Sequence, residues 1–148
     1  MLRRCLATWL LLTLPPGAVA HEGRQCLPEE ARSAEEGADR VRNWAELYQA
    51  YRRFGHCDSG AIAEGYSDRV VEMLAHKWKT LPQLNALVSV NPEFGEFIIR
   101  HIDLTAIWRS AQKAELNAKS RCPKQAATLC ARIASRVEEL RRDAEKMR

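Results

Sequence analysis

The chain lacks the short motifs that mark the common catalytic and cofactor sites. It has no C-x-x-C pair, which argues against a thioredoxin-type redox centre and against a zinc site built on paired cysteines. The H-E-x-x-H, G-x-S-x-G, P-loop and dinucleotide-binding signatures are absent, and so is the C-x-x-C-H sequence of haem attachment. The familiar hydrolase, oxidoreductase and nucleotide-dependent classes are therefore not indicated, and we expect no cofactor.

The sequence also has little excess charge of either sign. Its 148 residues include 23 Lys+Arg and 19 Asp+Glu, and Arg3 and Arg4 are the only cations among the first 20 residues. The remainder has a balance of 21 minus 19, or +2, which is too small to indicate a nucleic-acid partner. A content of 46% hydrophobic and 28% charged residues is typical of a globular protein, and the length suits one domain.

Long apolar runs are missing except near the N-terminus. Arg3 and Arg4 precede an uncharged apolar run over residues 5–14, and residues 18–20 have the A-x-A pattern of a signal-peptidase site. The run is shorter than the roughly 20 apolar residues that span a bilayer. We therefore predict a signal peptide over residues 1–20, cleaved near Ala20, and an exported protein of the periplasm or extracellular space without stable membrane insertion. An uncleaved anchor is the alternative.

Four cysteines remain after cleavage, because Cys5 lies in the signal peptide. An even number in an oxidising compartment predicts two disulfides, among Cys26, Cys57, Cys122 and Cys130. A continuous helix from Pro123 would hold Cys122 and Cys130 about 12 Å apart. A disulfide allows only about 4.4–6.8 Å between Cα atoms. We therefore favour a Cys57–Cys130 bridge, with Cys26–Cys122 fixing the N-terminal segment.

Apolar residues recur at spacings of three and four along most of the chain, and no segment alternates with period two. Helical stripes are expected over residues 41–54, 62–78, 84–88, 94–102, 104–120 and from 123 to the C-terminus. Gly55 is expected as a left-handed cap. Residues 21–38 are polar and indicate a loose lead-in, and the capping-box spacing at Ser33 offers the alternative that a helix begins there. The sequence thus predicts an all-α compact bundle of five to six helices over residues 39–148, with a long C-terminal helix and two disulfides.

The turn over residues 55–60 is the first candidate for chemistry. Cys57 precedes a helix, where a thiol pKa is lowered, and His56 or His101 with Asp103 could complete a nucleophilic site. A nucleophilic thiol must stay reduced, however, and exported thiols oxidise. We therefore interpret Cys57 as half of a disulfide.

An acidic ladder at four-residue spacing is the second candidate. Its side chains share one helix face and end in a Glu–His pair, and its members are Glu64, Asp68, Glu72 and His76. A solvated stripe and a partner-binding face both fit this pattern, whereas no second ligand pair supports a metal site. We take the ladder, with His56 and Asp58 of the turn, as the candidate partner-binding surface.

Two further histidines, His101 and His21, are candidates for catalysis or metal binding. His101 falls on an apolar helix face beside Arg100 and Asp103, which is typical of a hydrogen-bonded core histidine. His21 would become the N-terminal residue after cleavage, and its amine and imidazole could chelate copper with another histidine. We interpret His21 as a chance occurrence in a polar tail, so no metal ligand is assigned.

These observations favour a binding protein without catalysis. A small, exported, disulfide-stapled helical scaffold suits an inhibitor or immunity-type protein that blocks a secreted enzyme, an expectation based on analogy of class and compartment. The alternative is an envelope scaffold or maintenance protein that binds a resident partner through its long C-terminal helix. A thiol enzyme or a copper carrier is a third possibility. The oligomeric state stays open.

Overall fold

The computed structural model describes residues 23–147, so the expected signal peptide and His21 lie outside the described residues. Within this range the chain forms helices and no strand, which confirms the all-α prediction and the long C-terminal helix. No helix of this range is long and apolar enough to cross a membrane. The seven α-helices of the range, one more than the upper bound predicted, are α1 (Pro28–Arg40), α2 (Trp44–Phe54), α3 (Gly60–His76), α4 (Leu81–Val90), α5 (Pro92–Arg100), α6 (Trp108–Ser120) and α7 (Ala127–Lys146).

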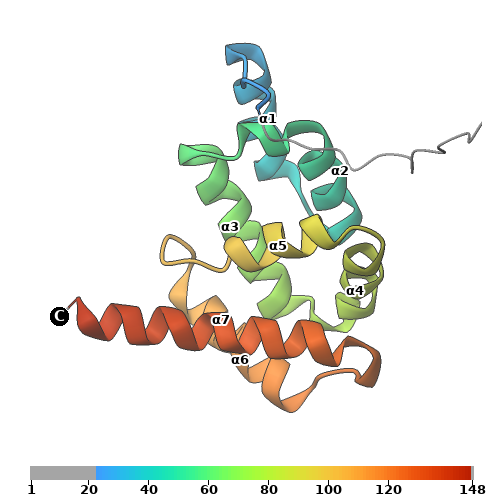
Figure 1. The fold of residues 1–148 in the computed structure, drawn as a ribbon, viewed down its shortest axis with the longest axis vertical. Coiled ribbons are helices and arrows are strands. Elements are labelled where there is room, and N and C mark those ends of the chain that lie inside the picture. Colours follow the sequence, from blue (N-terminus) through green and yellow to red (C-terminus); the bar gives the residue numbers. More distant parts are fainter. Residues whose placement is uncertain (1–22, 148) are drawn as a thin grey trace, which may run out of the picture.

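Helix α3 lies at the centre of the molecule. Figure 1 shows α1 and α2 at one end, α6 and α7 at the other, and α3 running between them. Three short 3-10 turns connect the helices: η1 (Gly55–Cys57), η2 (Trp78–Thr80) and η3 (Lys124–Ala126). An aromatic cluster joins α2, α3 and α5. The ring of Phe97 lies at its centre and contacts the rings of Tyr51, Tyr66 and Phe94. Burial of these rings provides much of the apolar stabilisation of the core.

Helix α1 occupies the segment that we expected to be a loose lead-in. Pro28 starts the helix, and Glu30 accepts a hydrogen bond from the backbone N–H of Leu27 at 3.3 Å. Its buried face is made of alanines, Ala34 and Ala38, which give little hydrophobic signal in a sequence. The helix packs closely on α3 because Gly65 has no side chain, since a Cβ there would lie 3.3 Å from Ala38 Cβ.

The turn after α2 also differs from the expectation. Gly55 has a φ of −59°, so it begins η1 in a right-handed conformation and is not a left-handed cap. The left-handed residue is Gly60, with a φ of 54°, at the first position of α3. A glycine suits this position because other residues seldom adopt positive φ.

The disulfides pair Cys26 with Cys57 and Cys122 with Cys130, with Cα–Cα distances of 5.0 and 6.1 Å. Two disulfides were predicted, but the favoured pairing was wrong. The distance argument assumed an α-helix from Pro123, whereas α7 begins at Ala127. Pro123 is extended, with a ψ of 138°, and the next residues form the η3 turn. This break lets Cys122 fold back to within reach of Cys130.

Helices α6 and α7 pack side by side, and the short disulfide closes the connection between them. Apolar residues of α7 that face the core include Leu129, Ile133, Val137 and Leu140. Beyond Leu140 the helix has no fully buried residue, and Figure 1 shows its C-terminal turns reaching past the other helices. The C-terminal turns of α7 therefore contribute little to the hydrophobic core.

Candidate functional site

The 55–60 turn is held against α1 and faces the interior. The Cys26–Cys57 disulfide ties η1 to the segment that precedes α1. The His56 side chain is fully buried, and its Nε2 lies 3.1 Å from Glu30 Oε2. This hydrogen bond, more than the backbone N–H of Leu27, lowers the pKa of Glu30. His56 was predicted to contact a partner, but the structure places its side chain inside the molecule.

Asp58 is likewise turned inward, with its side chain 8% exposed. Its Oδ2 lies 3.1 Å from His101 Nε2 and accepts a hydrogen bond from Arg100 Nη2 at 3.0 Å. Burial raises the pKa of Asp58, but the hydrogen bonds and charges of His101 and Arg100 outweigh burial and hold that pKa below its usual value. Arg100 and Asp103 flank His101 in the sequence, and the partner of Arg100 is Asp58.

His101 connects this carboxylate to a second one. Its Nδ1 lies 2.9 Å from Ser67 Oγ, and the Ser67 hydroxyl lies 2.8 Å from Asp103 Oδ2. The other oxygen of Asp103 accepts hydrogen bonds from Thr105 and from the backbone N–H of Ala106. Burial raises the pKa of Asp103, and the hydrogen bonds from Thr105 and Ser67 outweigh it, so the net shift is downward. We name the set Asp58, His101, Ser67 and Asp103 the His101 network.

The order Asp–His–Ser resembles a hydrolase triad in composition, but its setting is different. Ser67 is fully buried and His101 is 2% exposed. The Ser67 hydroxyl also lies 2.9 Å from the Ala63 carbonyl, so its single proton already has protein acceptors. A nucleophile must contact its substrate. The arrangement instead links the start of α3, the end of α5 and the following loop, which confirms the interpretation of His101 as a hydrogen-bonded core residue.

Two polar atoms beside the network have no hydrogen-bond partner among residues 23–147, the Tyr66 hydroxyl and Asp58 Oδ1. Burial, together with the charge of Asp58, raises the pKa of Tyr66 to about 12. Tyr66 therefore stays neutral beside the carboxylate at any physiological pH. The network thus retains some unused hydrogen-bonding capacity, at two atoms that are themselves buried.

Cys57 was the candidate nucleophile, and in the structure its sulfur is bonded to Cys26 and the residue is 1% exposed. One group of possible metal ligands occurs among the described residues, Glu30, His56 and Cys57, with donor atoms within 4.8 Å of one another. The disulfide occupies the Cys57 sulfur, so a carboxylate and an imidazole remain. Two donors make an incomplete metal site.

The acidic ladder lies on α3 as predicted, but its two halves differ. Glu72 accepts a hydrogen bond from Ser110 Oγ at 3.2 Å, and the ring of His76 lies 3.6 Å from Glu72 and 3.1 Å from Lys113 Nζ. This half therefore borders α6. Glu64 is exposed and Asp68 is half-buried.

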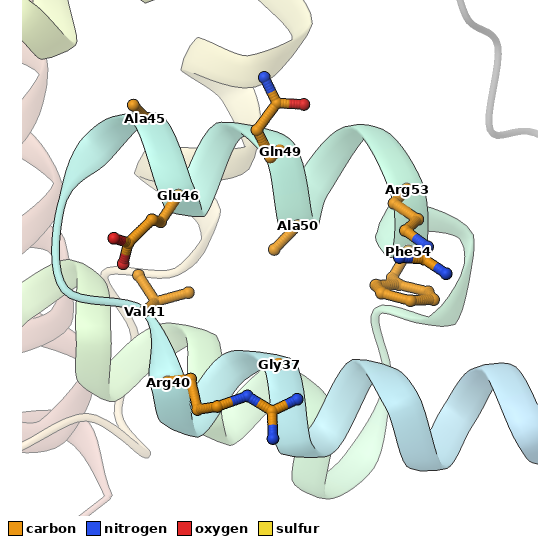
Figure 2. Close-up of a pocket in the computed structure, with 9 residues that line it drawn as sticks. All are labelled: Gly37, Arg40, Val41, Ala45, Glu46, Gln49, Ala50, Arg53 and Phe54. Atoms are coloured by element: carbon orange, nitrogen blue, oxygen red, sulfur yellow. The ribbon is translucent and has the colours of Figure 1, made fainter.

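A groove between α1 and α2 was not foreseen. Its volume is about 430 Å³, and Figure 2 shows the side chains that line it. Apolar or small residues form most of the lining, with charged side chains at its edges; the full set is Gly37, Arg40, Val41, Ala45, Glu46, Gln49, Ala50, Arg53 and Phe54. We call it the α1–α2 groove. The groove was not foreseen because residues 21–38 were expected to be a loose lead-in, whereas α1 begins at Pro28; Gly37 in this alanine-containing segment was the one visible signal.

A second hollow of about 480 Å³ adjoins this groove and shares Arg53 and Phe54 with it. Its lining is polar and contains three guanidinium groups and two carboxylates; the residues are Arg24, Glu29, Glu30, Ser33, Arg52, Arg53 and Phe54. We call it the basic hollow. An apolar groove thus continues into a polar one at the C-terminal end of α2.

Exposed apolar side chains gather where α6 begins and α7 ends. Leu104 is 50% exposed, Ile107 49% and Trp108 36%. Leu104 and Trp108 also line a pocket of about 350 Å³ with Ala144 of α7. We call these residues the α6–α7 patch. Large exposed apolar groups that adjoin one another mark interaction surfaces more often than chance.

Comparisons with protein-family models, with curated proteins and with solved structures found no match for this chain. The function is therefore inferred from the chain's own residues.

Proposed function

We propose that this chain is an exported binding protein without catalysis, of the inhibitor or immunity type, which blocks a secreted enzyme by covering part of its surface. One contrast carries the proposal. The polar groups that could perform chemistry, Ser67, His101 and Cys57, are buried and bonded to other protein groups, whereas Leu104 and Trp108 are exposed. A protein that acts by binding needs exposed apolar side chains and does not need accessible reactive groups.

The α6–α7 patch supplies the anchor for such a contact. Tryptophan is enriched among residues that dominate binding energy, above all where it sits beside a pocket that excludes water. Trp108 lines a pocket with Leu104 and Ala144, and Arg141 stands at its edge. An apolar centre with a charged edge is the usual anatomy of a protein interface.

The N-terminal half of the acidic ladder, Glu64 and Asp68, adds charge to the proposal. Glu64 and Asp68 remain available on α3, while His56 and Asp58 are enclosed and leave the candidate surface. Surface carboxylates steer association with a basic partner and affect its rate more than its final affinity. We therefore assign the ladder a secondary role.

The runner-up function is an envelope scaffold that binds a resident partner. The last turns of α7 favour it, because they extend past the core and Met147 is 69% exposed. Both functions require a protein partner. The partner is a secreted enzyme for the inhibitor and a resident envelope protein for the scaffold. A resident envelope protein bound without loss of any enzymatic activity would favour the scaffold.

The test is a titration of the purified protein against a panel of secreted muramidases, phospholipases and proteases. We expect stoichiometric inhibition of one of them, and we expect Leu104→Ser with Trp108→Ser to weaken it at least tenfold. Leu116→Ser is the matched control, because Leu116 is 64% exposed elsewhere on α6. Turnover by the protein itself, lost in Ser67→Ala, would refute the proposal.

A further inference from the structure

We propose that the α1–α2 groove is a binding site for a free medium- or long-chain carboxylate. The acyl chain lies along the apolar floor of the groove, and the carboxylate meets the guanidinium of Arg53 at the junction with the basic hollow. This inference is independent of the α6–α7 patch and of the proposed function.

The floor of the groove is open because residue 37 is a glycine. No neighbouring side chain requires a glycine at this position. A Cβ built on Gly37 would have no atom within 4 Å, whereas one on Gly65 or Gly95 would meet a neighbour at 3.3 or 2.8 Å. Glycine destabilises a helix interior relative to alanine. Packing accounts for that cost at Gly65 and Gly95 but not at Gly37, which instead leaves the space between the helices empty (Figure 2).

The charge at the end of the groove is positive and available. The guanidinium of Arg53 lies 4.8 Å from the centroid of the Phe54 ring, and that of Arg52 lies 5.9 Å from the Tyr48 ring. Within residues 23–147 neither arginine forms an ion pair. Aromatic faces attract these cations without neutralising them. A carboxylate at this end of the groove would therefore meet the guanidinium of Arg53, and Arg52 adds positive charge from the adjoining hollow.

The acidic residue of the groove does not cancel this charge. The carboxylate of Glu46 accepts hydrogen bonds from the backbone N–H of Arg42 at 2.7 Å and from Asn43 Nδ2 at 2.8 Å. It thus serves the start of α2, at the other end of the helix from Arg53. In the basic hollow, Glu30 is already bonded to Arg24 and His56, and the three arginines of the lining outnumber its two glutamates, Glu29 and Glu30. The groove is therefore apolar in the middle and cationic at the Phe54 end.

Its size favours a small amphiphile over a protein segment. A volume of 430 Å³ lies within the range of small-molecule sites, about 300–1,000 Å³. The groove follows α2 from Ala45 to Phe54, about 14 Å of helix. A stable protein interface buries about 800 Å² per partner and needs a larger footprint. A single acyl chain with a terminal anion matches the length of the groove, its apolar floor and the positive charge at its Phe54 end.

Calorimetric titration with octanoate, decanoate and dodecanoate tests the proposal. We expect one saturable site whose Kd falls about two- to fourfold with each added methylene, as burial of each group predicts. Dodecanol and dodecyltrimethylammonium have the same chain without the anion. They should bind at least threefold more weakly than dodecanoate.

Two substitutions locate the site. Gly37→Leu places a side chain in open space, so the fold should survive while dodecanoate binding falls at least tenfold. Arg53→Gln should weaken dodecanoate three- to tenfold and leave dodecanol unchanged. The matched controls are Ala61→Leu, at an exposed helical alanine, and Arg109→Gln, at an exposed arginine of α6, and neither should change binding.

Several outcomes would overturn the proposal. These are absence of saturable binding, equal affinity for the cationic amphiphile, or equal binding by the Gly37→Leu variant. Binding only to phosphatidylglycerol vesicles, and not to free dodecanoate, would assign the groove to a lipid surface instead. A dimer in sedimentation that dissociates in Gly37→Leu would assign it to a second copy of the chain.

Discussion

Two of the acid–histidine pairs of the structure, Asp58–His101 and Glu72–His76, are built from the same chemical groups but lie in different surroundings. Asp58 and His101 approach to 3.1 Å with side chains 8% and 3% exposed. Glu72 and His76 approach to 3.6 Å with side chains 41% and 50% exposed. The first we call the inner pair and the second the outer pair. Their contrast shows that burial and connectivity, and not residue type, decide what a pair contributes.

The inner pair connects separate parts of the chain. Asp58 lies in the turn before α3, His101 follows α5, and Ser67 extends the contact to Asp103 in the next loop. The outer pair joins residues four apart on one helix, and its other contacts are with Ser110 and Lys113 of the neighbouring helix α6. Breaking the inner pair should therefore affect the whole fold, while breaking the outer pair should affect one helix edge.

The largest effect is expected from Asp58→Ala. It leaves the buried His101 without its carboxylate partner, and removal of one partner from a buried pair costs about 3–5 kcal/mol of unfolding free energy. Glu72→Ala is the matched variant on the outer pair and should cost below about 1 kcal/mol. Urea unfolding followed by circular dichroism measures both. Equal losses would remove the distinction between the pairs.

The disulfide next to the inner pair should matter nearly as much. Cys26–Cys57 closes 31 residues and Cys122–Cys130 closes 8. Loop-closure entropy predicts a loss of about 3.7 kcal/mol for the first and about 2.5 kcal/mol for the second when serines replace the cysteines. Unfolding of the two double-serine variants tests the order. A larger loss at Cys122–Cys130 would show that η1 does not depend on its bridge to the N-terminal segment.

Acid should weaken the inner pair first. The pKa values of Asp58 and Asp103 are lowered by folding from the ordinary value of 3.8. The unfolded chain then binds more protons than the native one, so the stabilisation is present above about pH 4 and is lost as the pH falls through the lowered values. Stability measured from pH 6 to pH 2 should fall less steeply in Asp58→Asn than in the wild type. An unchanged slope would contradict the assignment.

The smallest effect is expected from the outer pair. Glu72→Gln or His76→Gln removes a half-exposed i,i+4 pair, which contributes about 0.3–0.5 kcal/mol. The loss should shrink further in 0.5 M salt, because exposed charges are screened. Thermal melts at low and high salt provide the comparison. A loss above about 2 kcal/mol would mean that the outer pair is structural after all.

Periodicity predicted most of the fold. The apolar stripes over residues 41–54, 94–102 and 123–147 gave the helical class and the long last helix, because one buried face repeats every three to four residues. It failed at α1, whose buried face is alanine, and at Cys122, where a local turn precedes α7. Both failures come from short-range geometry that hydrophobic spacing does not record.

The candidate site was harder to predict. The sequence singled out His56, Asp58 and His101 as chemically interesting, and the structure shows that each takes part in a buried contact. It did not indicate which side chains face inward, because the 55–60 turn has no periodicity. The α1–α2 groove depends on empty space between two helices, and empty space leaves no pattern in a sequence except Gly37.

Native mass spectrometry of the purified protein, mixed with the secreted hydrolases of the inhibition panel, tests the central claim most directly. The account predicts a complex with one hydrolase that is lost in the Leu104→Ser, Trp108→Ser variant and kept in Ser67→Ala. Free protein in every mixture, with hydrolytic turnover of its own that disappears in Ser67→Ala, would contradict it and make the buried His101 network an active site.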